Sequence, residues 1–338
     1  MKHLLVKIKE IVLFSFIQSK ARGFLSNMLL LVQILLIAAT AFADDCPPTD
    51  KVLPCSCNQD QGIPTVNCEG VNSITEIEPA VKNTVGFNVS FAILRSHLGD
   101  IPSDFFRGHT SVKLHFEQCV VRSFGDTPFR GLENSLETLN IYKVLDRSHT
   151  KLDKFRLSHL QKLKYVSLSE NDIGELGNHW FEGGPASLEQ LNLVSNKIEK
   201  VGDKVLASLV NLQQLYINTN RIKTVARSML PNPSKHLWLL EAKLNHIEEL
   251  PTDAFEGYPN LKIVNLSQNK LKSIPENVWG KVWNQLHAVY LDANNIVCDE
   301  NLKWIYTRKL PNAFVGRCGT GNKLQKRALN SLKLEDFQ

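Results

Sequence analysis

Seven cysteines are the residues in this 338-residue sequence whose chemistry depends most visibly on spacing. They form an early group of four, a late group of two and one isolated residue: Cys46, Cys55, Cys57 and Cys68; Cys298 and Cys318; and Cys119. In an oxidising compartment, cysteines are expected to pair as disulfides. Cys55 and Cys57 are separated by one residue, which does not match the C-x-x-C spacing of a zinc knuckle. The cysteines therefore favour a disulfide-bonded protein without a metal site.

No recognised catalytic motif accompanies these cysteines. The sequence contains no H-E-x-x-H, G-x-S-x-G or G-x-G-x-x-G pattern. Residues 319–323 are similar in composition to a phosphate-binding loop, but no serine or threonine follows Lys323. The sequence thus offers an enzyme no candidate site. We expect a protein that is not an enzyme and that uses no cofactor.

A leucine pattern of nearly constant length determines where the other residues lie. Six segments fit L-x-x-L-x-L-x-x-N-x-L: 160–173, 187–198, 211–222, 236–247, 260–271 and 285–296. Their asparagines follow one another at intervals of 24 or 25 residues: Asn171, Asn196, Asn220, Asn245, Asn269 and Asn294. This pattern is that of the leucine-rich repeat.

Three weaker copies extend the array upstream, which gives about nine repeats. Ser96, Cys119 and Val144 occupy the asparagine position in these copies. Ten residues after that position lies a second apolar stripe: Phe106, Phe129, Phe181, Leu206, Leu230, Phe255 and Trp279. The repeat from Val144 to Asn171 is 27 residues long and places Phe155 one residue late. We expect Cys119 to be a buried structural thiol, with a reactive or intermolecular thiol as the alternative.

The repeat predicts an α/β fold. Its alternating L-x-L core predicts a short strand with inward leucines, and stacked repeats bury one continuous core behind a parallel sheet. Each asparagine amide can pair with backbone groups of an adjacent turn, which cost about 1–3 kcal/mol each if buried and unpaired. We expect a right-handed leucine-rich-repeat solenoid over residues 81–296 with a concave parallel sheet. Caps are expected at 44–80 and, together with the tail, at 297–338.

Both ends of the array resemble the disulfide-bonded caps of extracellular leucine-rich-repeat proteins. The spacing C-x8-C-x-C-x10-C over residues 46–68 resembles the N-terminal cap. The C-terminal cap of such proteins usually begins with C-x-C, whereas here Glu300 occupies the second cysteine position and no cysteine follows Cys318. One of the usual C-terminal bridges is therefore missing and the other is kept. The bridges implied by this resemblance are Cys46–Cys57, Cys55–Cys68 and Cys298–Cys318.

The first 43 residues have the features of a secretory signal. Lys20 and Arg22 precede an apolar run over residues 28–43, and cleavage is expected after Ala43. The run of about 16 residues is shorter than the roughly 20 that span a membrane, and an uncleaved signal anchor is the alternative. Translation from Met1 and from Met28 both fit the pattern. We expect a secreted, extracellular product with no membrane span after signal cleavage.

The net charge of +5 is concentrated in that leader. The first 43 residues hold five basic residues and one acidic residue, which leaves 34 basic and 33 acidic residues in the remainder. A nucleic-acid-binding protein needs a basic face. The nearly neutral remainder therefore argues against a nucleic-acid partner.

Aromatic residues gather at the predicted solvent-facing positions of the sheet. Tyrosine and tryptophan contribute much of the energy of protein interfaces, although ordinary strand decoration is the alternative. The expected partner-binding residues are Tyr142, Tyr165, Tyr216, Trp238, Glu241 and Tyr290. Glycosylation sequons begin at Asn88 and Asn265, and the repeat register places Asn265 in one row with Tyr216, Glu241 and Tyr290. A glycan on Asn265 would cover this end of the face and shift binding to Tyr142, Tyr165 and the N-terminal half.

Two segments carry a narrower resemblance. Residues 46–68 and 296–318 resemble the arthropod proteins named as the non-catalytic subunit of Oplophorus-type luciferin 2-monooxygenase. The resemblance implies a secreted subunit without oxygenase residues that accompanies a catalytic chain. From the sequence we expect a protein that binds or stabilises a protein partner through its concave face. The alternatives are a subunit of a secreted oxygenase complex and an extracellular-matrix or adhesion component.

Overall fold

The computed structural model describes residues 45–60, 62–232, 234–321 and 323–338, and Cys46–Gln338 form one compact unit. The predicted leader, with its cleavage site after Ala43 and its two possible start residues, lies outside the described residues. The predicted boundaries of the caps and of the repeat array stay predictions.

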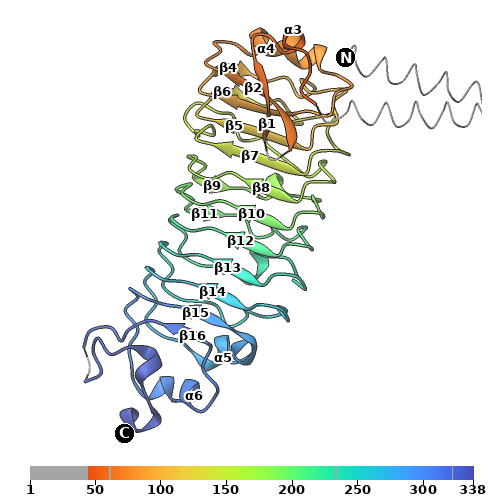
Figure 1. Cartoon of the computed structure of the whole chain (residues 1–338). Helices are drawn as coiled ribbons and strands as arrows, with labels where there is room; N and C mark the ends of the chain where they lie inside the picture. The colour runs from red at the N-terminus through yellow and green to blue at the C-terminus, as the bar shows by residue number, and fades with distance from the viewer. Residues whose placement is uncertain (1–44, 61, 233, 322) are drawn as a thin grey trace, which may run out of the picture. The chain divides into compact units, whose positions relative to one another are not determined.

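A sheet of 12 strands runs through this unit, and Figure 1 shows the strands stacked in chain order. β1 pairs antiparallel with β2, and every later neighbour in the sheet pairs parallel. The parallel sheet expected from the repeats is confirmed. The strands are β1 (Ser56–Asp60), β2 (Ile63–Glu69), β3 (Ser90–Leu94), β5 (Lys113–Glu117), β7 (Thr138–Tyr142), β8 (Tyr165–Ser167), β10 (Gln190–Asn192), β12 (Gln214–Tyr216), β13 (Leu239–Glu241), β14 (Ile263–Asn265), β15 (Ala288–Tyr290) and β16 (Ala313–Val315).

Short elements complete each coil. Two small parallel sheets pair β4 (His97–Asp100) with β6 (Val120–Ser123), and β9 (Glu175–Leu176) with β11 (Lys200–Val201). Within the described residues the α-helices are α3 (Thr49–Val52), α4 (Ile74–Asn83), α5 (Glu276–Trp279) and α6 (Lys303–Tyr306). The 3-10 helices are η1 (Asn178–Trp180), η2 (Arg227–Met229), η3 (Trp283–Gln285), η4 (Glu300–Leu302), η5 (Leu329–Ser331) and η6 (Leu334–Phe337).

The core lies behind the sheet and is continuous from cap to cap. The inward residue at the centre of each short strand is buried, and so is the whole predicted aromatic and leucine stripe. Phe155, displaced by one residue in the sequence, still joins the core, where its ring lies 5.7 Å from that of Phe124 and 4.9 Å from that of Trp180. The longer repeat therefore absorbs its extra length without a break in the core.

The asparagine ladder pairs the backbone of one coil with that of the next. Asn220 shows the complete pattern: its Oδ1 accepts hydrogen bonds from the backbone N–H of Asn196 and Ile198, both at 3.0 Å. Its Nδ2 donates to the carbonyl oxygens of Leu193 at 2.9 Å and Ile217 at 3.0 Å. The predicted role of the asparagines is thus confirmed, because the side-chain amide pairs with buried backbone groups of its own coil and of the preceding one.

One turn residue recurs in every repeat. The residue before the asparagine position has a φ between 46° and 58° in all nine: Arg95, Gln118, Lys143, Glu170, Ser195, Thr219, Leu244, Gln268 and Ala293. None of these is glycine, although the left-handed region favours glycine. In most of them the N–H still donates to the neighbouring repeat, as Ser195 N–H does to the Asn218 carbonyl at 3.0 Å. The inter-coil hydrogen bonds therefore continue past the end of the strand to this turn residue, which lies one residue beyond β3 and three residues beyond β10.

Disulfides close both ends. The bridges are Cys46–Cys57, Cys55–Cys68 and Cys298–Cys318, which are the pairs that the cap resemblance implied. At the C-terminal end, Trp304 is buried and its Nε1–H donates to the Ile274 carbonyl at 3.0 Å. Cys119 is free and buried.

Candidate protein-binding face

The sheet register aligns four of the residues singled out from the sequence. Tyr216 pairs with Glu241, Glu241 with Asn265, and Asn265 with Tyr290. All four side chains are half-buried, and each is separated from its neighbour by one strand spacing of about 4.8 Å. They form a single row across β12–β15, as the repeat period predicts.

The charged member of this row is hydrogen-bonded by amides. Glu241 Oε2 accepts from Asn265 Nδ2 at 2.9 Å and from Asn218 Nδ2 at 3.4 Å. Burial raises the pKa of the Glu241 carboxyl, and these amide hydrogen bonds oppose that rise. Burial also raises the pKa of Tyr216, with a further contribution from the Glu241 charge. The centre of the row is therefore a partly desolvated carboxylate beside an aromatic ring.

An apolar row lies next to this one on the same strands. Leu239, Ile263, Ala288 and Ala313 follow one another in register across β13–β16. Leu239 and Ala288 are each only 7% exposed, so these two positions are less open than the alternation of the repeat suggests. The last residue of β16, Val315, is 40% exposed beside Tyr290. We call Tyr216, Leu239, Glu241, Ile263, Asn265, Tyr290 and Val315 the Glu241 surface.

The preceding strands are polar at the same positions. Tyr165 is followed in register by Gln190 and Gln214, and Ser167 by Asn192. Tyr165 thus lies in the row that continues through Gln190 and Gln214 into the apolar row at Leu239. Tyr142 on β7 pairs with Glu117 of β5. Trp238, half-buried, immediately precedes β13. The six predicted contact residues therefore fall into a compact group near Glu241 and a separate pair, Tyr142 and Tyr165, on β7 and β8.

The two sequons lie in different surroundings. The Asn265 amide is already engaged, because Nδ2 donates to Glu241 and Oδ1 accepts from the Ser267 N–H at 3.0 Å. Ser267, the sequon hydroxyl residue, is buried. Asn88 is half-buried in the loop before β3 and is followed by the buried Val89 and Ser90. Glycosylation of either asparagine stays a prediction.

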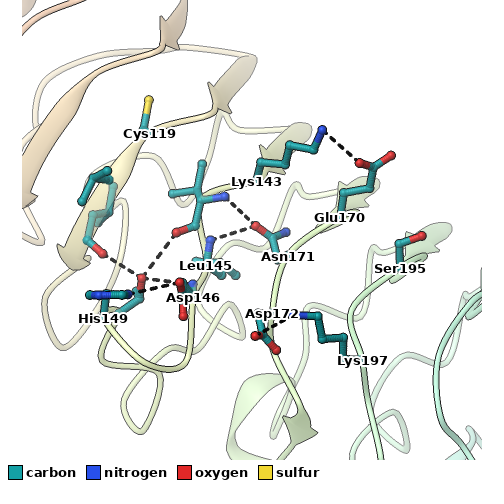
Figure 2. A pocket seen from close by; sticks show the side chains of 14 residues that line it. Cys119, Lys143, Leu145, Asp146, His149, Glu170, Asn171, Asp172, Ser195 and Lys197 are labelled. Carbon is teal, nitrogen blue, oxygen red and sulfur yellow. Dashed lines mark hydrogen bonds and ion pairs between the residues drawn. The ribbon is translucent and has the colours of Figure 1, made fainter.

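A hollow lies beside one of the three ladder positions at which another residue replaces asparagine. This hollow of about 800 Å³ opens beside Val144 and is lined by Cys119, Leu145 and Thr150 among others (Figure 2). Asn171 of the next coil follows the regular ladder pattern here, since its Oδ1 accepts from the N–H of both Val144 and Leu145 at 2.8 Å. Two ion pairs border the hollow: Lys143–Glu170 at 3.2 Å and Lys197–Asp172 at 3.0 Å.

Asp146 and His149, which line this hollow, and Ser148 between them have the composition of a hydrolase triad but not its geometry. Ser148 Oγ lies 2.7 Å from His149 Nδ1, and Asp146 Oδ2 lies 3.1 Å from the same nitrogen. A triad histidine receives the serine proton on one ring nitrogen and is oriented by the carboxylate through the other. Ser148 also donates to Asp146, at 2.5 Å, and its hydrogen bonds lower the pKa of that carboxyl to about 2. This arrangement is a turn-stabilising network.

Cys119 at the edge of the hollow lies in an environment that disfavours its thiolate. It is 3% exposed and its Sγ–H donates to the carbonyl oxygens of Ile93 and Glu117, each at 3.3 Å. Burial raises its pKa to about 11. Since the thiolate is the nucleophile, this environment favours the structural role that the sequence suggested.

The described ranges contain neither a metal cluster nor a membrane-spanning helix. No group of three or more His, Cys, Asp or Glu side chains in them could hold a metal ion. No helix in this part of the chain is long and apolar enough to cross a membrane.

Comparison with known proteins agrees with the repeat assignment. The leucine rich repeat family model matches residues 161–222 and 236–296. The chain is 31% identical to osteomodulin of Bos taurus over 40% of its length, 29% identical to lumican of Gallus gallus over 44%, and 28% identical to Toll-like receptor 2 type-1 of Gallus gallus over 67%. These alignments span 31%, 49% and 27% of the respective relatives, less than half in each case.

Solved structures share the fold. A chain of the octameric complex of Latrophilin 3, Unc5D and FLRT2 superposes with a TM-score of 0.61 at 16% identity, covering 86% of this chain and 98% of the other. A chain of the TLR13–ssRNA13 complex superposes with a TM-score of 0.54 at 24% identity, covering 68% of this chain and 35% of the other. The chain thus has a leucine-rich-repeat fold and is similar in sequence to osteomodulin, lumican and Toll-like receptor 2 type-1.

Proposed function

We propose that this chain is an extracellular protein that binds a protein partner through the solvent-facing, concave side of its sheet and has no catalytic activity of its own. The observation that carries the proposal is the Glu241 surface, where an aromatic and polar row lies beside an apolar row on β12–β16. Aromatic anchors surrounded by apolar contacts are typical of the centre of protein interfaces. The polar rows of β8 and β10 lack this combination.

Two observations support an extracellular location. Disulfides persist in oxidising compartments, and three of them close the ends of the array. Lumican and osteomodulin, to which the chain is similar, are secreted matrix proteins. The predicted leader over residues 1–43 points the same way. A protein partner is favoured over a nucleic acid because the chain after the leader is nearly neutral.

Two finer roles follow from different observations. Similarity to osteomodulin and lumican favours a matrix or adhesion component. The segments 46–68 and 296–318 favour a non-catalytic subunit of a secreted oxygenase complex. Purification from native secretions separates these roles, because a stoichiometric catalytic chain would support the subunit and retention in insoluble matrix would support the structural component.

Cross-linking of the native complex tests the binding face. Lys243 and Lys262 flank Glu241 on the sheet, whereas Lys281 lies exposed in the loop after α5. With an amine-reactive cross-linker and native secretion as the source of partners, we expect cross-links to Lys243 and Lys262 and none to Lys281. The double variant Tyr216→Ala/Tyr290→Ala should weaken capture of the cross-linked partner by about tenfold or more. Val210→Ala, at an exposed loop position outside the sheet, is the control, and an equal loss in this control would overturn the proposed face.

A further inference from the structure

Glu241 differs from the other carboxylates of the described chain in its surroundings. Surface carboxylates here commonly pair with Lys or Arg of a neighbouring coil, as in Glu199–Arg221 at 2.7 Å and Glu137–Lys164 at 2.8 Å. Glu241 takes part in no such ion pair within the described residues. Its hydrogen bonds come from neutral amides, and among the described carboxyl groups whose pKa departs from its ordinary value, only that of Glu241 is raised.

One oxygen of this carboxylate is free to accept another donor. Both amide hydrogen bonds reach Oε2. Oε1 receives no hydrogen bond from a described residue, and it is not among the buried unpaired atoms. The two amides fix the side chain in place, since Asn218 Oδ1 is held by the Lys243 N–H at 2.7 Å and Asn265 Oδ1 by the Ser267 N–H at 3.0 Å. The carboxylate is therefore pre-oriented, with Oε1 toward solvent.

Any partner that covers the row must cover this charge. Glu241 lies between Tyr216 and Asn265, with Tyr290 on the following strand. Desolvating an ionised carboxylate is costly unless a cation or further donors compensate. The charge of Lys243 favours the ionised form of Glu241, but neither Lys243 nor Lys262 forms an ion pair with it in the described structure. The missing compensation has to come from the partner.

We propose that the Glu241 surface recognises a lysine or arginine side chain of the partner, with the cationic group donating to Glu241 Oε1 beside the ring of Tyr216. A charge-assisted hydrogen bond in a partly desolvated site is about twice as strong as a neutral one. An adjacent aromatic ring adds a cation–π contribution. The neighbouring apolar row would hold aliphatic or aromatic side chains that flank this cation. The inference rests on the proposed function, because it names the chemistry of the partner at the same face.

Selection of displayed peptides tests this chemistry directly. The probe is a library of random twelve-residue peptides displayed on phage and selected on the secreted full chain. The selected peptides are then tested on the Tyr216→Ala/Tyr290→Ala variant. Those that fail to bind this variant are kept, because their binding depends on the two rings. Glu241→Gln keeps the shape and an acceptor oxygen but removes the charge. Glu189→Gln, at an exposed position just before β10, is the matched control.

We expect selected peptides to share one Lys or Arg flanked by apolar residues. Glu241→Gln should weaken them by about tenfold or more, while Glu189→Gln leaves their affinity unchanged. Replacing the shared cation in the peptide should remove the difference between the parent chain and Glu241→Gln. Peptides that depend on Tyr216 and Tyr290 but carry no shared cation would overturn this inference and leave the proposed face intact. Failure to select any peptide that depends on those tyrosines would overturn both, and thermal unfolding of each variant excludes a folding defect as the cause.

Discussion

Replacement of Asn171 by alanine should destabilise the protein more than the same change at Asn196. Asn171 serves two coils, because its Oδ1 accepts from the N–H groups of Val144 and Leu145 at 2.8 Å. Its Nδ2 donates to the carbonyl oxygens of Ile141 at 2.9 Å and Leu168 at 2.7 Å. These are the same kinds of bond that Asn220 makes in its part of the ladder.

The structure also supplies the control. Asn196 lies in the next coil and is fully buried, but its Oδ1 has no hydrogen-bond partner among the described residues. Its Nδ2 donates to the Leu168 carbonyl at 2.8 Å, and that carbonyl also accepts from Asn171. Asn196→Ala therefore leaves no backbone N–H unpaired, whereas Asn171→Ala leaves two.

The expected magnitudes follow from the number of groups left unpaired. A buried unpaired backbone group costs about 1–3 kcal/mol, so Asn171→Ala should lower the free energy of unfolding by roughly 2–6 kcal/mol. Asn196→Ala should lower it by about 1–2 kcal/mol, because the Leu168 carbonyl keeps one donor. Asn171→Asp keeps an acceptor for both N–H groups and should fall between the two alanine variants.

Urea unfolding followed by tryptophan fluorescence measures these differences. Because repeat arrays can lose cooperativity, hydrogen exchange at the amides of Val144 and Leu145 provides a local reading of the same effect. Those two amides should exchange faster in Asn171→Ala and unchanged in Asn196→Ala. Equal destabilisation by the two alanine variants would refute the argument that the number of backbone N–H groups left unpaired sets the cost.

Four further outcomes are expected. Burial raises the pKa of Cys119 from its ordinary value of 9.0 to about 11. Because the folded-state pKa is the higher one, the neutral thiol stabilises the fold below pH 9, and this contribution is lost as the pH rises toward 11. The free energies of unfolding of the parent chain and of Cys119→Ala should therefore differ less at about pH 11 than at about pH 8. Cys318→Ser breaks the bridge to Cys298 and should cost about 2–5 kcal/mol and reduce secretion, whereas Cys119→Ser should leave the secreted yield much nearer to that of the parent chain in an immunoblot of the medium. Glycopeptide mass spectrometry of native protein should find Asn265 unmodified, because its amide is engaged by Glu241 and its sequon serine is buried. Full occupancy of Asn265 by a glycan would contradict binding at the Glu241 surface. The N-terminus of the secreted product should read Asp44-Asp45-Cys46, and a membrane-retained product that keeps residues 28–43 would support the signal-anchor alternative.

The repeat period was enough to derive the parallel sheet and its register from the sequence. Because successive asparagines are 24 or 25 residues apart, equivalent residues of adjacent coils must lie side by side, and Tyr216, Glu241, Asn265 and Tyr290 do so. The disulfide pairs could be named only through resemblance to known caps, since spacing alone allows other pairings. The aromatic stripe was equally predictable, because its members repeat with the same period.

Tertiary structure decided the features that depend on contacts between coils or on backbone geometry. The left-handed turn residue gave no sequence signal, because Arg, Gln, Lys, Glu, Ser, Thr, Leu and Ala all occupy it and the inter-coil hydrogen bonds impose its conformation. The double role of Asn171 appears only when the N–H groups of Val144 and Leu145 are placed beside it. The state of Glu241 likewise depends on Asn218 and Asn265, which come from two other coils. A sequence period fixes which residues are neighbours, but burial and hydrogen bonding depend on the side chains of several coils at once, and these are fixed only when the coils stack.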